Sequence, residues 1–269
     1  FDVKLIASDQ EVDAPFVQAD FDKSELELVN ITSIVQLSEQ KTAEFQLLSN
    51  ENTWLSDKFE WVFGLFYLES SGGFDPIAFD IKGSVAASIL ATQTGAAGQA
   101  VLDITNALGI DLGGVVPDIT LYAGGVLDSE AESAYFQGTY FVLPELSLTA
   151  GIRHQEEERN LLNSRLSAPD GEGGENIIRA DTVPQLDASQ TSARVAIQWF
   201  PFGEDIQLYT SWGKTFKSPT YNTVNLLDTP ESVEEEEVNS YELGFKSTLL
   251  DGNLRLNGAV FHIQQKNLL

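Results

Sequence analysis

The stretch from Thr191 to Lys217, TSARVAIQWFPFGEDIQLYTSWGKTFK, decides the expected fold because its side chains alternate between two faces. Its first half sets one mainly apolar face against one mainly polar face: Ala193, Val195, Ile197 and Trp199 against Ser192, Arg194, Ala196 and Gln198. The alternation resumes in Ile206–Lys217, after the short connection PFGED. A period of two is typical of a β-strand with two different faces. The stretch therefore predicts two antiparallel strands joined in a hairpin.

The same pattern recurs along most of the chain. It predicts three further hairpins: Thr42–Ser49 with Lys58–Glu69, Ser129–Leu143 with Leu146–Gln155, and Tyr241–Leu249 with Asn253–Ile263. Leu26–Leu37 is expected to form an earlier strand. Asp251 and Gly252 form the strongest short-range hairpin signal, and Pro144 suits a turn. The total is about nine strands of about ten residues, the length that a tilted strand needs to cross a bilayer.

Long connections separate the predicted hairpins, at Ser70–Asp128, Glu156–Ala188 and Ser218–Val238. Short turns therefore alternate with long loops. This alternation favours an all-β fold, an antiparallel transmembrane β-barrel with short periplasmic turns and long extracellular loops. The longest loop contains a possible helix within Ser84–Ile110, which we expect to be packed locally, with a lid over the barrel mouth as the alternative.

The composition excludes several classes of function. The chain has 269 residues, 41 acidic and 15 basic, which gives a net charge of −26. Such a field repels nucleic acid, so no nucleic-acid partner is expected. The absence of cysteine excludes disulfides and thiolate metal sites. Because the chain begins at Phe1 and contains no Met, we expect a processed chain or a fragment.

No short catalytic motif occurs in the chain, so we expect neither an enzyme nor a cofactor site. His154 precedes Glu156, Glu157 and Glu158, a group that could be drawn as a metal site. Since no second histidine lies nearby, we interpret this segment as a strand end that enters a solvated acidic loop. We therefore predict no metal site.

The segment PESVEEEEVNSYELGFKSTLLDGNLRLNGAVFHIQ, residues 230–264, resembles the barrel of TonB-dependent outer-membrane receptors, where an acidic stretch precedes Y-E-x-G-x-K and a D-G hairpin. DIQLYTSWGKTFKSPTYN, residues 205–222, is similar to a strand of that barrel that rises into an extracellular loop. The resemblance extends from about Leu26 to the end of the chain. The family barrel has about twenty-two strands. We therefore expect residues 1–269 to be a fragment of the barrel domain, without the plug domain and the C-terminal strands.

The resemblance implies a receptor in the bacterial outer membrane for energy-coupled uptake of a scarce nutrient, such as a ferric siderophore or cobalamin. Its expected partners are outer-membrane lipid, that nutrient, and the TonB complex through the plug domain. A passive porin-like barrel and a soluble acidic calcium-binding β-protein are the alternatives. Partition into the aqueous phase without detergent would favour the soluble protein.

In such a barrel the apolar face of each strand contacts lipid and the polar face lines the lumen. The expected lumen-facing residues are Arg153, Arg194, Gln198, Gln207, Tyr209, Lys246, Arg255 and Asn257. The expected interface anchors on the apolar face are Trp199, Trp212, Tyr241 and Phe245. Lys214 shares the apolar face, where its place late in an outward strand puts it near the outer interface.

Overall fold

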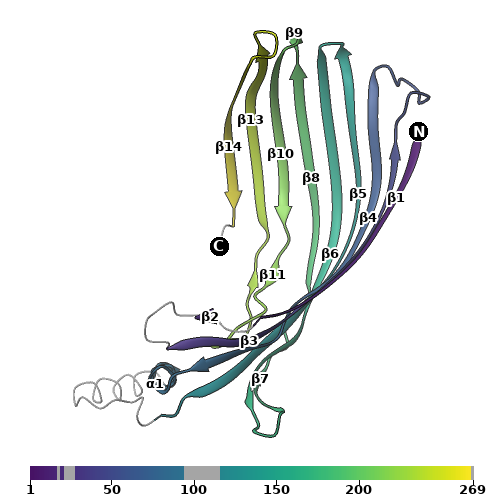
Figure 1. Ribbon diagram of the computed structural model, residues 1–269. Coiled ribbons are helices and arrows are strands. Elements are labelled where there is room, and N and C mark those ends of the chain that lie inside the picture. The colour runs from purple at the N-terminus through teal and green to yellow at the C-terminus, as the bar shows by residue number, and fades with distance from the viewer. Residues whose placement is uncertain (17–18, 21–27, 94–115, 268–269) are drawn as a thin grey trace.

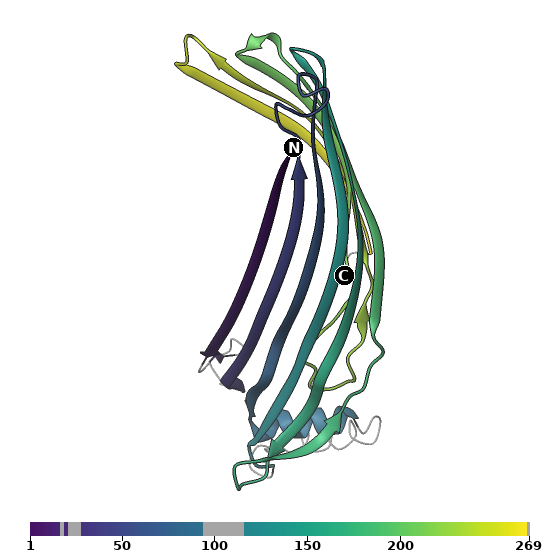
Figure 2. The ribbon, with the colours of Figure 1, turned by 90° about the vertical axis from the view of Figure 1, so that its right-hand side faces the viewer.

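The computed structural model describes residues 1–16, 19–20, 28–93 and 116–267. These residues form one curved antiparallel sheet, shown from two sides in Figures 1 and 2. Its main strands follow one another in chain order: β1 (Asp2–Phe16), β3 (Val29–Leu48), β4 (Phe59–Ile81), β5 (Ile119–Leu143), β6 (Leu146–Pro169), β8 (Leu186–Trp199), β10 (Ile206–Lys217), β13 (Glu236–Leu249) and β14 (Leu254–Lys266). Consecutive neighbours of this kind are the arrangement of an up-and-down barrel wall.

Short elements complete the fold. They are β2 (Ala19–Asp20), α1 (Gly83–Gln93), β7 (Glu175–Ala180), β9 (Pro201–Glu204), β11 (Thr220–Tyr221) and β12 (Ser232–Val233). β2 pairs with β3, β7 pairs with β6, and β11 pairs with β12 in a separate small sheet. Within the described residues β1 and β14 do not pair with each other, so the sheet is open and both edges are free.

The predicted alternation of short and long connections is confirmed. Short turns lie at one end of the sheet, at 49–58, 144–145, 200–205 and 250–253. The described parts of the longer connections, 82–93 with 116–118, 170–185 and 218–235, lie at the other end. At the last turn Leu250, Asp251 and Gly252 all have positive φ, of 54°, 53° and 88°. Glycine adopts this conformation without steric cost, which explains its place in the hairpin.

The predicted strand lengths are wrong for the central strands. β3, β4, β5 and β6 contain 20, 23, 25 and 24 residues. Leu26–Leu37 and Thr42–Ser49 belong largely to one strand. The two ends of the expected loop at Ser70–Asp128 continue β4 to Ile81 and begin β5 at Ile119, with Ser70 opposite Ser129. β1 was not predicted. The backbone ladder continues beyond the residues whose apolar and polar side chains alternate, so the pattern that marks a strand in the sequence ends before the strand does.

The buried core is small and lies at the end with the long connections. It consists of Ile77, Phe79, Ile81, Ala86, Ala123 and Leu166, with Val85, Val224 and Leu226 packed against it. α1 begins at Gly83, whose backbone N–H donates to Asp118 at 2.9 Å. Ala86 of this helix packs in the core against the strands, as expected of a locally packed helix. Residues 94–110 of the predicted helix lie outside the described residues. None of the described helices has the length and hydropathy of a membrane-spanning helix.

Candidate functional site

The strand register gives the sheet two chemically different faces. Residues that lie opposite each other on neighbouring strands share a face, and here they are called a rung. Arg153 lies opposite Ser192, Gln198 opposite Tyr209, and Gln207 opposite Lys246, which lies opposite Asn257. One face, the polar face, therefore holds every predicted site residue: Arg153, Arg194, Gln198, Gln207, Tyr209, Lys246, Arg255 and Asn257.

The opposite face, the apolar face, presents large apolar side chains to the outside. Exposed examples are Leu65, Phe136, Leu148, Ile152, Val195, Ile197, Leu208, Leu243, Leu256 and Val260. The predicted anchors also lie here: Trp199 opposite Leu208 near the short turns, and Trp212 opposite Tyr241 toward the long connections. An exposed apolar surface of this extent, bounded by aromatic residues, is typical of a lipid-contacting barrel wall.

A hollow of about 550 Å³ lies mainly on the polar face between β3, β5, β6, β8 and β10. Glu44 and Tyr135 meet at its edge, where the tyrosine hydroxyl donates to the carboxylate at 2.6 Å. Gln46 Nε2 donates to both, at 3.0 Å to Glu44 and 2.9 Å to Tyr135. Sequence reasoning did not single out these three residues. The period-two pattern placed Tyr135 on a strand, but its partners lie about ninety positions away in the chain.

Arg153 and Arg194 supply positive charge to the same hollow. The Arg153 guanidinium lies 5.3 Å from the centre of the Phe66 ring and donates through Nη2 to Gln155 at 3.1 Å. Its Nε is buried without a hydrogen-bond partner among the described residues. Arg194 is exposed and likewise forms no hydrogen bond or ion pair within the described part of the chain. The hollow therefore offers unpaired guanidinium donors, which suit an anionic or carbonyl oxygen.

A second polar group lies on β10 and β13. The Tyr209 hydroxyl donates to Glu242 at 2.5 Å, and the Lys246 ammonium lies 5.6 Å from the centre of the Tyr209 ring. Gln198 lies opposite Tyr209 on β8, and Arg255 and Asn257 continue the face onto the edge strand β14. The structure thus divides the predicted residues between the hollow, which contains Arg153 and Arg194, and this second group.

Toward the long connections, Glu157 helps to hold the segment that begins at Ser218, directly after β10, against the polar face. This carboxylate is only 6% exposed, and it accepts hydrogen bonds from Ser218 at 2.5 Å and from Arg159 at 2.6 Å. Arg159 also donates to the carbonyl of Pro219 at 3.2 Å. The predicted solvated loop at Glu156–Glu158 is therefore wrong. β6 continues through it, so that Glu157 is buried on one face while Glu156 and Glu158 are exposed on the other.

His154 lies on the apolar face beside the exposed acids. Its Nδ1 is 3.0 Å from Thr191 Oγ1, and its Nε2 is 3.7 Å from Glu156. Within residues 1–16, 19–20, 28–93 and 116–267, no group of three or more histidine and acidic side chains is placed to hold a metal ion.

Farther out, an ion-pair cluster ties β7 to β4 and β6. Arg165 binds Glu175 through Nε at 2.9 Å and Asp75 through Nη1. The Arg165 guanidinium, helped by the Ser167 hydroxyl, lowers the pKa of Glu175 below its ordinary value despite partial burial. A lowered pKa keeps this carboxylate ionised at neutral pH.

Comparison with known proteins decides the family. The family model described as "TonB dependent receptor-like, beta-barrel" matches residues 11–269. The chain belongs to this family. It is a barrel protein of the Gram-negative outer membrane, in a family of transporters and receptors rather than enzymes. The soluble calcium-binding alternative is thereby excluded. No curated protein matches the receptor in sequence.

Solved structures agree with this assignment. The ferric yersiniabactin uptake receptor FyuA from Yersinia pestis superposes with a TM-score of 0.65 at 15% identity, over 99% of this chain and 33% of FyuA. The siderophore receptor PiuA from Acinetobacter baumannii gives a TM-score of 0.56 at 17% identity, over 96% of this chain and 36% of PiuA. Identities this low show a shared fold alone. The chain spans about a third of the length of these receptors.

Proposed function

We propose that the polar face lines the interior of a receptor that takes up a scarce nutrient, such as a ferric siderophore or cobalamin, with energy supplied through a plug domain and the TonB complex. The family match supports this proposal, as does the likeness to FyuA, a ferric yersiniabactin uptake receptor, and to PiuA, a siderophore receptor. The chain would form part of the barrel wall, since its curved sheet has two free edges within the described residues.

Burial supports the assignment of the polar face to the interior. Side chains on the inner side of a curved sheet crowd one another, whereas those on the outer side splay apart. Buried side chains of the barrel wall gather on the polar face, for example Ser133, Glu157, Gln190 and Ala196. Large apolar side chains on the opposite face stay exposed. All eight predicted residues would then face the lumen.

The main structural support for this proposal comes from the unpaired guanidinium donors of Arg153 and Arg194 in the hollow. In a lumen they would contact an anionic substrate, or a carboxylate of the plug domain, where charge-assisted hydrogen bonds are strong. The test is uptake by cells that produce the complete receptor, measured with a panel of radiolabelled ferric siderophores and cobalamin under nutrient limitation.

Uptake of one panel member should depend on the receptor and on TonB, and the double variant Arg153→Gln with Arg194→Gln should reduce it about tenfold or more, corresponding to about 1.4 kcal/mol. Lys58→Gln, an exposed change in a short turn that removes one positive charge away from the hollow, is the control. Receptor-dependent uptake that persists without TonB would instead identify a passive barrel.

A further inference from the structure

Residues 218–226, which follow β10 directly, lie against the polar face and are here called the inner segment. The closest approach is at Gly125 of β5, where a β-carbon would collide with the carbonyl oxygen of Thr223. Gly125 is eight residues from Ser133 along β5, so both lie on the polar face. A glycine without a side chain lets a second backbone approach a strand this closely. The inner segment is therefore in direct contact with the barrel wall.

Hydrogen bonds hold the inner segment along its length. Its first residue donates to the buried Glu157 carboxylate. In the middle, Tyr221 is 6% exposed and its hydroxyl donates to the Pro184 carbonyl at 2.8 Å. Near the end, Arg179 Nη2 donates to the Asn225 carbonyl at 2.8 Å. Pro184 and Arg179 both belong to the chain between β6 and β8, so two long connections hold each other in place.

Apolar side chains of the inner segment also pack on the wall. Val224 and Leu226 contact the buried core that contains Ile77 and Ala123. Ala123 is two residues from Gly125 along β5 and shares its face. Burial of apolar surface favours the attached conformation of the segment. At the long-connection end the polar face therefore carries a second layer.

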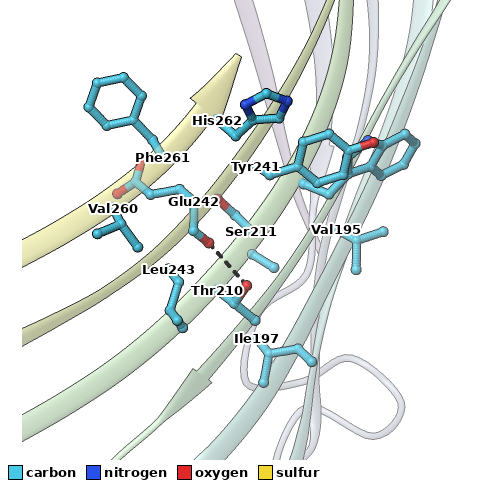
Figure 3. Close-up of a pocket in the computed structure, with 12 residues that line it drawn as sticks. Val195, Ile197, Thr210, Ser211, Tyr241, Glu242, Leu243, Val260, Phe261 and His262 are labelled. Carbon is cyan, nitrogen blue, oxygen red and sulfur yellow. Dashed lines mark hydrogen bonds between the residues drawn. The ribbon is translucent and has the colours of Figure 1, made fainter. Parts of the chain in front are cut away.

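The apolar face is, by contrast, a single layer. Figure 3 shows a groove of about 430 Å³ on this face, over β8, β10, β13 and β14. Ile197 and Leu243 border the groove and remain 41% and 58% exposed. The second layer thus lies on the face proposed to line the lumen, where it can act on a passing solute.

The inner segment lies between the long connections and the hollow. The hydroxyl oxygen of Ser218 is 3.5 Å from the side-chain oxygen of Gln190 on β8. Ser192, two residues from Gln190 toward the short turns, borders the hollow and lies opposite Arg153. Since the long connections of such a barrel are extracellular, a solute that enters from outside passes the inner segment before it reaches Arg153.

We propose that the inner segment is a fixed constriction of the entrance and limits the size of the solutes that reach the hollow at Arg153 and Arg194. This inference rests on the proposed function only in assigning the polar face to the interior of the barrel. The contact at Gly125, the hydrogen bonds to two other parts of the chain and the buried apolar side chains support it. A freely moving loop would lack such contacts along its length.

The test is thiol labelling from outside on cells that produce the complete receptor, with the receptor lacking an added cysteine as background. Ser192→Cys reports on the hollow, and the exposed Glu172→Cys reports on the outer surface. A small maleimide should react at both positions. A maleimide carried on a long polyethylene glycol chain should react at position 192 about tenfold or more slowly than at position 172. Equal rates with the large reagent would overturn the proposal, as would a position 192 closed to the small one.

Two variants release the segment by different routes. Gly125→Leu should push it off the wall, so that the large reagent reacts at position 192 about fivefold or more faster. Glu157→Ala, which frees the start of the segment, should have the same effect. Gly72→Leu is the matched control on the polar face of the neighbouring strand β4, because a β-carbon there would meet no described atom closer than the Leu37 carbonyl oxygen at 3.9 Å. If neither release variant changed the rate, or if Gly72→Leu raised it equally, the proposal would be wrong.

The labelling requires neither nutrient nor TonB, so its result is separate from that of the uptake test. Ile197→Cys, on the apolar face, checks the assignment of the two faces. With the proposed faces it should not react, because a thiol among acyl chains stays protonated. Reaction of the small maleimide at position 197 and not at position 192 would show that the faces are reversed, and would refute the proposed function together with the constriction.

Discussion

Tyr209 lies flat against Gly244 of the neighbouring strand, so closely that a β-carbon at Gly244 would fall 2.5 Å from the tyrosine ring. Tyr135 covers Gly64 in the same way, with a β-carbon at 2.2 Å from the ring. In both pairs the glycine allows the ring to lie along the polar face instead of standing out from it. The Tyr209 hydroxyl thereby reaches Glu242 on the adjacent strand β13, and the Tyr135 hydroxyl reaches across β4 to Glu44 on β3.

The first prediction concerns this packing. Gly244→Val should displace the Tyr209 ring, break its hydrogen bond to Glu242 and destabilise the receptor by about 1–3 kcal/mol. The measurement is thermal unfolding in detergent. Gly213→Val is the control on the same face, because a β-carbon there meets only the Ala193 carbonyl at 3.9 Å. If the two variants lowered the unfolding temperature equally, the position of the Tyr209 ring would not depend on the space left by Gly244.

The second prediction concerns the segment fastened by Glu157. Glu157→Ala should release Ser218 and leave Arg159 without its carboxylate, at a cost of about 1–3 kcal/mol for the lost charged hydrogen bonds. Backbone amides of residues 218–226 should then exchange with solvent at least tenfold faster. Glu158→Ala, an exposed change on the other face, should leave their exchange rates unaltered. Unchanged exchange in Glu157→Ala would mean that other contacts hold the segment.

The third prediction follows from the lowered pKa of Glu175. A carboxylate whose pKa is lower in the folded state stabilises that state above its unfolded pKa, about 4.3, and loses this contribution as the pH falls through the folded value. Protection of the Glu175–Ala180 amides from hydrogen exchange should therefore decrease as the pH falls below the unfolded value, because β7 then loses its attachment to β6. Glu175→Gln should remove this acid dependence, whereas the exposed Glu172→Gln should retain it. If the pH dependence of hydrogen exchange were the same with and without Glu175→Gln, the proposed role of the ion pair between Arg165 and Glu175 would be contradicted.

The fourth prediction concerns the two free edges. Residues 1–269 expressed alone in buffer without detergent should associate or aggregate, because β1 and β14 present unpaired ladders and the apolar face is uncovered. Analytical ultracentrifugation and a thermal scan report on this directly. A monodisperse monomer that unfolds in one cooperative step would show that the sheet protects its own edges.

Sequence patterns predicted the sheet where its two faces meet different surroundings. Between Leu146 and Ile152 apolar and polar residues alternate, because the strand there separates the apolar face from the polar face. Beyond Ile152 the pattern disappears, because Glu156 and Glu157 lie on opposite faces and both are acidic. The strand nevertheless continues to Pro169, held by backbone hydrogen bonds that leave no mark on residue type.

For the candidate site, sequence patterns likewise predicted the face on which each residue lies and did not predict its partners. Period two was sufficient to place Arg153, Arg194 and Lys246 on one face, since face is a local property of each strand. The partners of these residues depend on register between distant strands. The contact between Glu44 and Tyr135 joins positions 91 residues apart, and no local pattern predicts it. The burial of Glu157 likewise depends on a segment that returns 61 residues later.

The central claim is that the apolar face contacts lipid and the polar face lines the lumen. Ile197 and Gln198 are adjacent on β8 and test it directly, and the lack of cysteine in this chain leaves it without competing sites for single-cysteine spin labels. In the complete receptor in bilayers, the label at 197 should collide preferentially with oxygen and the label at 198 with a water-soluble nickel chelate. The same preference at both positions, or the reverse order, would contradict the account.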